Sequence, residues 1–141
     1  MSEEENNETN KNEGKYNILL VDDDKFLLDM YSMKFTQEGV NVQASLSAKD
    51  ALDALRGGFQ AHAVVFDLVM PEFDGFALLK SIRDEHLAEN TVLVALTNQG
   101  EDEERKKTEE LGADAYIVKA STVPSEVVST ITDMIRAKVG A

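Results

Sequence analysis

Four short stretches of the sequence carry side chains that could perform chemistry together. The stretch "VDDD" at 21–24 places three aspartates directly after an apolar run, and "VVFD" at 64–67 ends a second apolar run on an aspartate. Thr97 and Lys119 each follow a further apolar run. Carboxylates that crowd into a small crevice repel one another, so a positive charge has to offset them. A divalent cation and the amine of Lys119 are the two candidates.

The chemistry that such a group could support is phosphoryl transfer. Carboxylate, carbonyl and water oxygens suit Mg²⁺, which keeps some waters and leaves ligand positions free for phosphate oxygens. Asp67 could then act as a nucleophile and form an aspartyl phosphate. Mg²⁺ would bridge Asp23 and one phosphoryl oxygen, while Lys119 and the Thr97 hydroxyl would bind the other two. This reaction requires mainly positioning and charge neutralisation, which these side chains supply.

The elements that must position these residues follow from two alternating hydrophobic periods. Apolar runs predict strands, and apolar residues spaced by three and four predict helices. The predicted strands cover 16–21, 40–45, 63–67, 91–96 and 113–118, and the predicted helices 24–39, 47–58, 75–86, 101–112 and 124–139. This order predicts an α/β fold in which helices cover both faces of a five-stranded parallel sheet, a doubly wound three-layer sandwich. Functional groups are expected at the carboxyl ends of the strands.

Two of the predicted helices have distinctive side chains. In helix 24–39, Leu27, Met30, Tyr31 and Phe35 are predicted to face the core, with Asp24 as its cap. Helix 101–112 has Leu111 as its one large apolar residue. Acid-before-base pairs one turn apart, each worth about 0.2–0.5 kcal/mol, are predicted to stabilise this solvated helix. These pairs are Glu101–Arg105, Asp102–Lys106 and Glu103–Lys107.

Size and composition limit the remaining possibilities. The 141 residues suit one domain, predicted at 16–141, after an acidic and polar tail at 1–15 that we expect to be disordered. The net charge of −13 argues against binding to nucleic acid or to anionic membranes. The chain has no cysteine, no signal peptide and no apolar stretch long enough to span a membrane, which fits a cytoplasmic protein.

Taken together, these stretches resemble the receiver domain of two-component response regulators, in its stand-alone single-domain form. The resemblance is carried by "VDDD" (21–24), "FDLVMPEFDG" (66–75), "ALTN" (95–98) and "GADAYIVK" (112–119), in the order and at the spacing of that family. Each motif alone is weak, but all of them together, each closing a predicted strand, are highly specific. The resemblance implies the flavodoxin-like (βα)5 fold.

The resemblance also implies roles for individual residues. Asp67 would be the phosphoacceptor, and a sensor histidine kinase or a histidine phosphotransfer protein would be the donor. Asp22, Asp23 and Asp67, with the backbone carbonyl of Val69, would be the protein ligands of Mg²⁺. Thr97 and Tyr116 would form a switch pair that responds to phosphorylation. Such a domain catalyses its own phosphorylation and is not an enzyme with a separate substrate. Its downstream target, which the sequence does not name, would be bound by the face of helix 101–112, strand 113–118 and helix 124–139.

Two positions depart from the family pattern. Ala120 stands where the family usually has a proline after the lysine, and a cis bond before alanine costs about 3 kcal/mol, so a trans bond is predicted. This change could alter the aim of Lys119 and its coupling to the output face. Val69, two residues after Asp67, offers no group that would activate water, which favours a long-lived phosphoryl group. Because no effector domain follows residue 141, we expect output by partner binding or relay.

Other classes of protein remain as alternatives. A degenerate receiver that binds proteins independently of phosphorylation stays open because of Ala120. A Mg²⁺-dependent phosphohydrolase with an aspartate nucleophile usually needs a second carboxylate where this chain has Val69, and a cap domain for which there is no room. A flavin or nucleotide binder would want a phosphate-binding loop where this chain has three aspartates. His62 and His86 have no partner pattern and are predicted to be surface residues.

Overall fold

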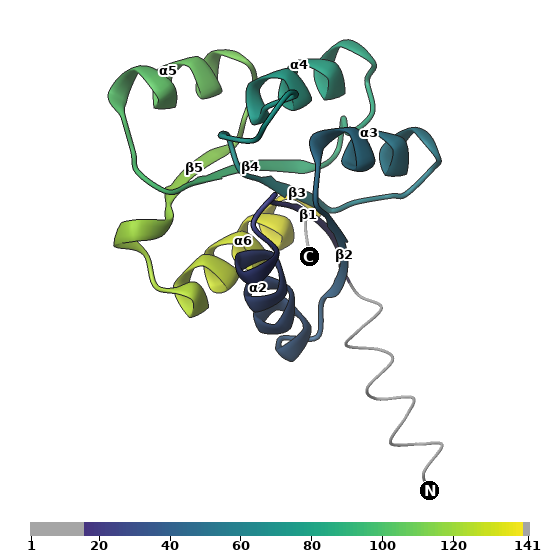
Figure 1. Cartoon of the computed structure of the whole chain (residues 1–141). Helices are drawn as coiled ribbons and strands as arrows, with labels where there is room; N and C mark the ends of the chain where they lie inside the picture. Colours follow the sequence, from purple (N-terminus) through teal and green to yellow (C-terminus); the bar gives the residue numbers. More distant parts are fainter. Residues whose placement is uncertain (1–15, 140–141) are drawn as a thin grey trace, which may run out of the picture.

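A single parallel sheet forms the centre of the molecule. The computed structural model describes residues 16–139. Five strands lie in the order β2-β1-β3-β4-β5, and every neighbouring pair is parallel. Helices α2 and α6 cover one face of the sheet, and α3, α4 and α5 cover the other (Figure 1). The predicted three-layer α/β sandwich with a five-stranded parallel sheet is confirmed. The tail predicted at 1–15 lies outside the described residues.

The predicted elements all form, with ends that differ by a few residues. The strands are β1 (Asn17–Val21), β2 (Asn41–Ser45), β3 (Ala63–Phe66), β4 (Val92–Thr97) and β5 (Ala115–Val118). The helices are α2 (Lys25–Gln37), α3 (Ala48–Arg56), α4 (Gly75–Asp84), α5 (Asp102–Glu110) and α6 (Pro124–Val139), and a short 3₁₀ turn, η1, covers Lys119–Ser121. Most helices are shorter than predicted because their capping residues belong to the adjoining turns.

The strand register brings the carboxyl ends of four strands to one edge. Val21 at the end of β1 pairs with Phe66 at the end of β3. Phe66 in turn pairs with Ala95 on β4, and Thr97 at the end of β4 pairs with Val118 at the end of β5. The residues that follow these strands therefore emerge side by side, as the sequence predicts.

Two hydrophobic cores, one on each side of the sheet, hold this edge in place. The core under α2 and α6 includes Phe35, Ile131 and Ile135, each fully buried. Helix α2 buries Leu28, Tyr31 and Phe35. The predicted inward face was incomplete: Leu27 and Met30 are half-buried and do pack against this core, but the prediction omitted the buried Leu28. The stripe at 28, 31 and 35 is itself helical, so the choice between adjacent stripes depends on how α2 packs against the sheet and α6.

Helix α5 corrects another prediction. Among the described residues, none of the three predicted acid–base pairs within this helix forms an ion pair. Arg105 instead lies over the ring of Tyr116, with its Cζ 4.6 Å from the ring centroid, and Lys107 Nζ lies 4.3 Å from the centroid of Phe76. Both cations therefore contact aromatic rings on neighbouring elements. A cation above a ring is attracted by the electrons of the ring face, and its aliphatic stem covers apolar surface.

None of the described helices has both the length and the apolar character needed to cross a membrane.

We predict that Phe35→Ala lowers the free energy of unfolding by about 3–5 kcal/mol, because it leaves a cavity between α2, α6 and the sheet. Urea unfolding followed by circular dichroism measures this. Phe26→Ala on the same helix is the matched control, because Phe26 is 77% exposed and its loss should change stability by less than about 0.5 kcal/mol. Equal effects of the two changes would contradict the described packing of α2.

Candidate functional site

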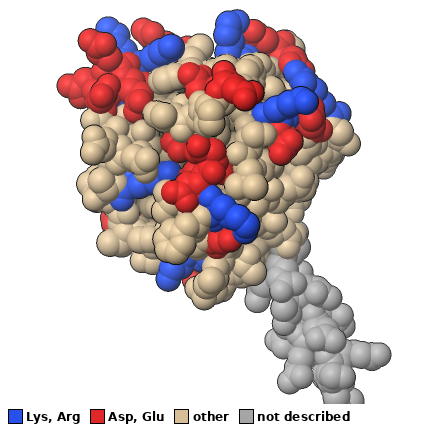
Figure 2. All heavy atoms as spheres, in the orientation of Figure 1, with Lys and Arg blue, Asp and Glu red and all other residues tan. Residues whose placement is uncertain are grey.

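Three carboxylates meet at the carboxyl edge of the sheet. Asp22 and Asp23 follow β1, and Asp67 follows β3. One oxygen from each of the three lies within 4.8 Å of the others, Asp22 and Asp67 being buried and Asp23 exposed. A backbone hydrogen bond holds the two buried residues next to each other: the Asp67 N–H donates to the carbonyl of Val21, the residue before Asp22, at 3.0 Å. Figure 2, in the orientation of Figure 1, shows a compact group of acidic atoms near the middle of this face.

Lys119, at the end of β5, supplies the positive charge. Its Nζ donates to Asp22 Oδ2 at 2.8 Å and lies 3.8 Å from Asp67 Oδ2, and its side chain is only 7% exposed. No cis peptide bond occurs in the described residues, so the predicted trans bond before Ala120 is confirmed. The concern that Ala120 would change the aim of Lys119 is answered by these distances: the amine is directed at the carboxylates.

The carboxyl group of Asp67 lies in a buried and negatively charged environment. Burial raises its pKa above the ordinary value of 3.8, and the negative charges of Asp22 and Asp23 raise the pKa further. The ammonium of Lys119 and the N–H of Val69, which donates to Asp67 Oδ1 at 3.3 Å, act in the opposite direction. Burial is the largest of these effects, and together with the repulsion it outweighs the two partners, so the pKa of Asp67 stays above its ordinary value.

The loop after Asp67 is fixed by its backbone. The N–H of Gly75 donates to the Leu68 carbonyl at 3.0 Å, and a Cβ at position 75 would lie 2.4 Å from the carbonyl oxygen of Asp67. Asp74 accepts from the Ala77 N–H and caps α4. Only glycine lets the start of α4 approach the Asp67 backbone this closely. The need for glycine at this position follows only from the packing of α4 against the Asp67 backbone, and nothing local in the sequence indicates it.

The predicted switch residues lie on β4 and β5, which are neighbouring strands on one side of β3. Thr97, 2% exposed, ends β4. Tyr116 on β5 is half-buried and faces α5, where its hydroxyl donates to the carboxylate of Glu104. Asp24 serves as the predicted cap of α2 by accepting from the N–H groups of Phe26 and Leu27.

Two residues near the site were not expected to matter. Tyr31 is buried in α2, and its pKa is raised by burial and, to a smaller extent, by the charge of Asp22. It also lines a hollow together with Lys119 and Ala120. Glu104, the second of the two, contacts Tyr116. Sequence periodicity placed Tyr31 in the core and Glu104 in a solvated helix, and no local signal in the sequence indicates either contact.

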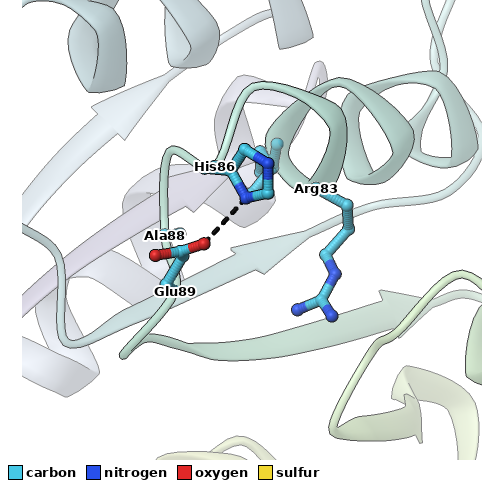
Figure 3. Close-up of a pocket in the computed structure, with 5 residues that line it drawn as sticks. Arg83, His86, Ala88 and Glu89 are labelled. Carbon is cyan, nitrogen blue, oxygen red and sulfur yellow. Dashed lines mark hydrogen bonds and ion pairs between the residues drawn. The ribbon is translucent and has the colours of Figure 1, made fainter.

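The two histidines lie away from the carboxylates. Figure 3 shows His86 and Arg83 beside a hollow after the end of α4, where His86 Nδ1 lies 2.7 Å from Glu89 Oε2. His86 is an exposed surface residue, as predicted, although it has this acidic partner. His62 is half-buried and not simply a surface residue, because its Nδ1 accepts from the Asn17 N–H at 2.9 Å.

Comparison with known proteins gives the same picture. The family model of the response regulator receiver domain matches residues 18–132. The chain is 32% identical over 119 residues to the regulatory protein VanRc of Enterococcus gallinarum, covering 84% of this chain and 49% of that protein. It is 35% identical over 102 residues to the transcriptional regulatory protein CpxR of Escherichia coli K12, covering 72% and 42%. The chain thus spans less than half the length of these relatives.

A solved structure agrees in fold. The BeF3-activated receiver domain of DrrB, a response regulator of Thermotoga maritima, superimposes with a TM-score of 0.75 at 28% identity, over 86% of this chain and 97% of that domain. The flavodoxin-like fold is therefore confirmed. The chain belongs to the response regulator receiver family of two-component systems.

The donor set of the site fits a hard divalent cation. Three carboxylates within 4.8 Å of one another supply oxygen ligands alone, and oxygen ligands select Mg²⁺, Ca²⁺ or Mn²⁺ over softer metals. Burial keeps the pKa of Asp67 above its ordinary value, and the charges of Asp22 and Asp23 act in the same direction, so a cation bound beside them would stabilise the ionised carboxylate.

We predict that Asp67→Asn stabilises the metal-free protein at pH 7. Because folding raises the Asp67 pKa, wild-type stability falls as pH rises from about 3.8 through that raised pKa, and it stays lower above it. Asparagine does not ionise, so the variant should be more stable by about 0.5–2 kcal/mol at pH 7, with a smaller difference at lower pH. Urea unfolding with a chelator present measures this.

Asp24→Asn is the control for this prediction, because asparagine caps a helix as well as aspartate does and stability should hardly change. An Asp67→Asn protein no more stable than wild type at pH 7 would contradict the electrostatic strain at the site.

Proposed function

We propose that the chain accepts a phosphoryl group on Asp67 in a Mg²⁺-dependent reaction, with a sensor histidine kinase or a histidine phosphotransfer protein as donor. One observation carries the proposal. The carboxylates of Asp22, Asp23 and Asp67 converge within 4.8 Å, and Lys119 Nζ lies 2.8 Å from Asp22. Buried charges of one sign are costly unless they are paired, so this arrangement indicates a function that brings in further positive charge.

The chain's own residues could hold the metal ion. Asp22, Asp23 and Asp67 offer carboxylate oxygens, and Val69 offers its backbone carbonyl. A bound Mg²⁺ would neutralise the carboxylates and supply ligand positions for phosphoryl oxygens. Lys119 would remain as a second, fixed cation beside the reacting groups.

The transfer step itself requires little beyond positioning. An Asp67 oxygen attacks the phosphorus of a phosphohistidine, the P–N bond breaks, and its electron pair stays on the imidazole of the donor. Lys119 and the Thr97 hydroxyl bind phosphoryl oxygens as charge shifts onto them. Val69 is 69% exposed and carries no polar group, so it gives an attacking water no assistance. We therefore expect a long-lived phosphoryl group and no turnover of a separate substrate.

The signal would pass from Thr97 to Tyr116. Phosphorylation adds charge beside Lys119 and draws the Thr97 hydroxyl inward, and the ring of Tyr116 follows. Output would then be read at α5, β5 and α6 by a protein partner. The excess of acidic atoms at the upper left in Figure 2, over α5, disfavours nucleic acid as that partner. A cytoplasmic location is part of the same proposal.

We predict that Mg²⁺ and acetyl phosphate together produce a covalent adduct of one phosphoryl group on wild type and on Asp24→Asn, but none on Asp67→Asn. Intact-protein mass spectrometry measures the adduct. Release of phosphate from esters without an adduct would favour the phosphohydrolase. A chain that binds its partner but forms no adduct would favour a phosphorylation-independent binding module.

We predict that Asp23→Ala abolishes Mg²⁺-dependent phosphorylation, because it removes the exposed carboxylate of the proposed metal site. In wild type, Mg²⁺ at 100 times its dissociation constant should add about 2.7 kcal/mol to the free energy of unfolding. Urea unfolding with and without Mg²⁺ measures this gain, which the variant should lose. An unchanged phosphorylation rate in Asp23→Ala would refute the metal role of this residue.

A further inference from the structure

The hydroxyl of Tyr116 lies between two groups at the amino end of α5. It donates to Oε1 of Glu104 and accepts from the backbone N–H of Glu101 at 3.2 Å. The guanidinium of Arg105 lies over its ring, 4.6 Å from the centroid. A Cβ at Gly100 would lie 3.7 Å from the ring edge, so the ring also packs against the β4–α5 loop. The Tyr116 side chain is thus held against the first turn of α5 and the loop that precedes it, which we call its outward position.

The two hydrogen bonds complete the amino-terminal cap of α5. Glu101 is the N-cap residue, and its own side chain makes no capping bond. Glu104 is the third helical residue, from which a glutamate in a capping box reaches back to the N-cap N–H. In this protein the Tyr116 hydroxyl stands between these two groups and bonds to both. A side chain of β5 therefore satisfies an N–H that the helix would otherwise leave unpaired.

Helix α5 has few other attachments to the domain. All nine of its residues are described, and Thr108 is the only buried one. Thr108 uses its hydroxyl within the helix, bonding to the Glu104 carbonyl at 2.6 Å. The contact of Lys107 with the Phe76 ring lies one turn further along. The position of the first turn therefore depends strongly on Tyr116, and the position of Tyr116 depends on that turn.

We propose that Glu104 is a latch residue that holds Tyr116 outward and so opposes the switched state of the domain. This inference rests on the proposed function, in which Tyr116 turns inward on phosphorylation. Inward rotation has to break the bonds to Glu104 and Glu101 and the contact with Arg105. Glu104 is then free to bond the Glu101 N–H directly, so α5 exchanges one cap for another.

The latch has a thermodynamic consequence at the phosphoryl site. A ligand that prefers the inward state binds more weakly in proportion to how rarely that state is populated. Removing the latch raises the inward population, and linkage requires that the phosphoryl group or its analogue then binds more tightly. The effect operates through Tyr116, since Glu104 itself is not among the carboxylates of the site.

The test is the affinity for beryllofluoride, used as a phosphoryl analogue with Mg²⁺ and followed by fluorine NMR. We expect Glu104→Ala to bind about five-fold more tightly than wild type, a factor equivalent to about 1 kcal/mol. Glu103→Ala is the matched control, because it removes the same charge from the same turn of α5. Its side chain is exposed and makes no hydrogen bond to any described residue, so its affinity should equal that of wild type.

A double-mutant cycle makes the test specific to the hydroxyl. Tyr116→Phe should also tighten binding, and Glu104→Ala should add nothing further in that background. Glu104→Gln, which keeps an oxygen acceptor, should fall between wild type and Glu104→Ala, and it replaces the latter if that variant does not fold. If wild type binds beryllofluoride and Glu104→Ala binds equally well, the latch is wrong while the proposed function stands. If wild type neither binds it nor forms the Asp67 adduct, both are wrong.

Discussion

Repulsion among the carboxylates at the end of the sheet is the constraint on which the rest of the structure depends. Asp22 and Asp67 are buried next to each other, and Asp23 lies beside them. The ammonium of Lys119 is close enough to bind them, yet it leaves the pKa of Asp67 raised. A folded chain keeps such a group only if the surrounding structure holds it in place. In the proposed function, this electrostatic strain would be the means by which the site attracts a cation and responds to an added phosphoryl group.

The scaffold that imposes this strain is the parallel sheet with its two cores. Val21, Phe66 and Thr97 are fixed in register by strands whose side chains are almost wholly buried. Gly75 holds the following helix against the backbone of Asp67. The acids cannot move apart without disrupting this packing, because a close-packed interior does not deform gradually.

Helix α5, in contrast to the sheet, is only loosely packed against the rest of the domain. This helix has one buried residue, and its cations rest on the rings of Tyr116 and Phe76. Elements that move during switching come from the weakly packed part of a protein. The rigid edge that holds the acids and the loosely attached helix are joined through β5, which carries Tyr116 and is followed directly by Lys119. One strand thus links the charge of the site to the surface proposed for output.

The sequence by itself determined the order of elements, the parallel sheet and the set of residues at its edge. Hydrophobic period and residue type are local properties, and the carboxyl ends of parallel strands always share one edge. The sequence did not determine how deeply each apolar residue of α2 is buried, since Leu28 is buried whereas the predicted Leu27 is half-buried against the same core. Nor did it indicate that Arg105 and Lys107 would leave their acidic neighbours for aromatic rings.

Only the tertiary structure decided the contacts between residues that are distant in sequence. The distance from Lys119 to Asp22, the approach of Gly75 to Asp67 and the bond from Tyr116 to Glu104 are of this kind. Each depends on how elements pack, and spacing along a chain does not specify the rotation of a helix or the direction of a side chain. For that reason the residues of the site could be predicted from the sequence, and the contact of Tyr116 with α5 could not.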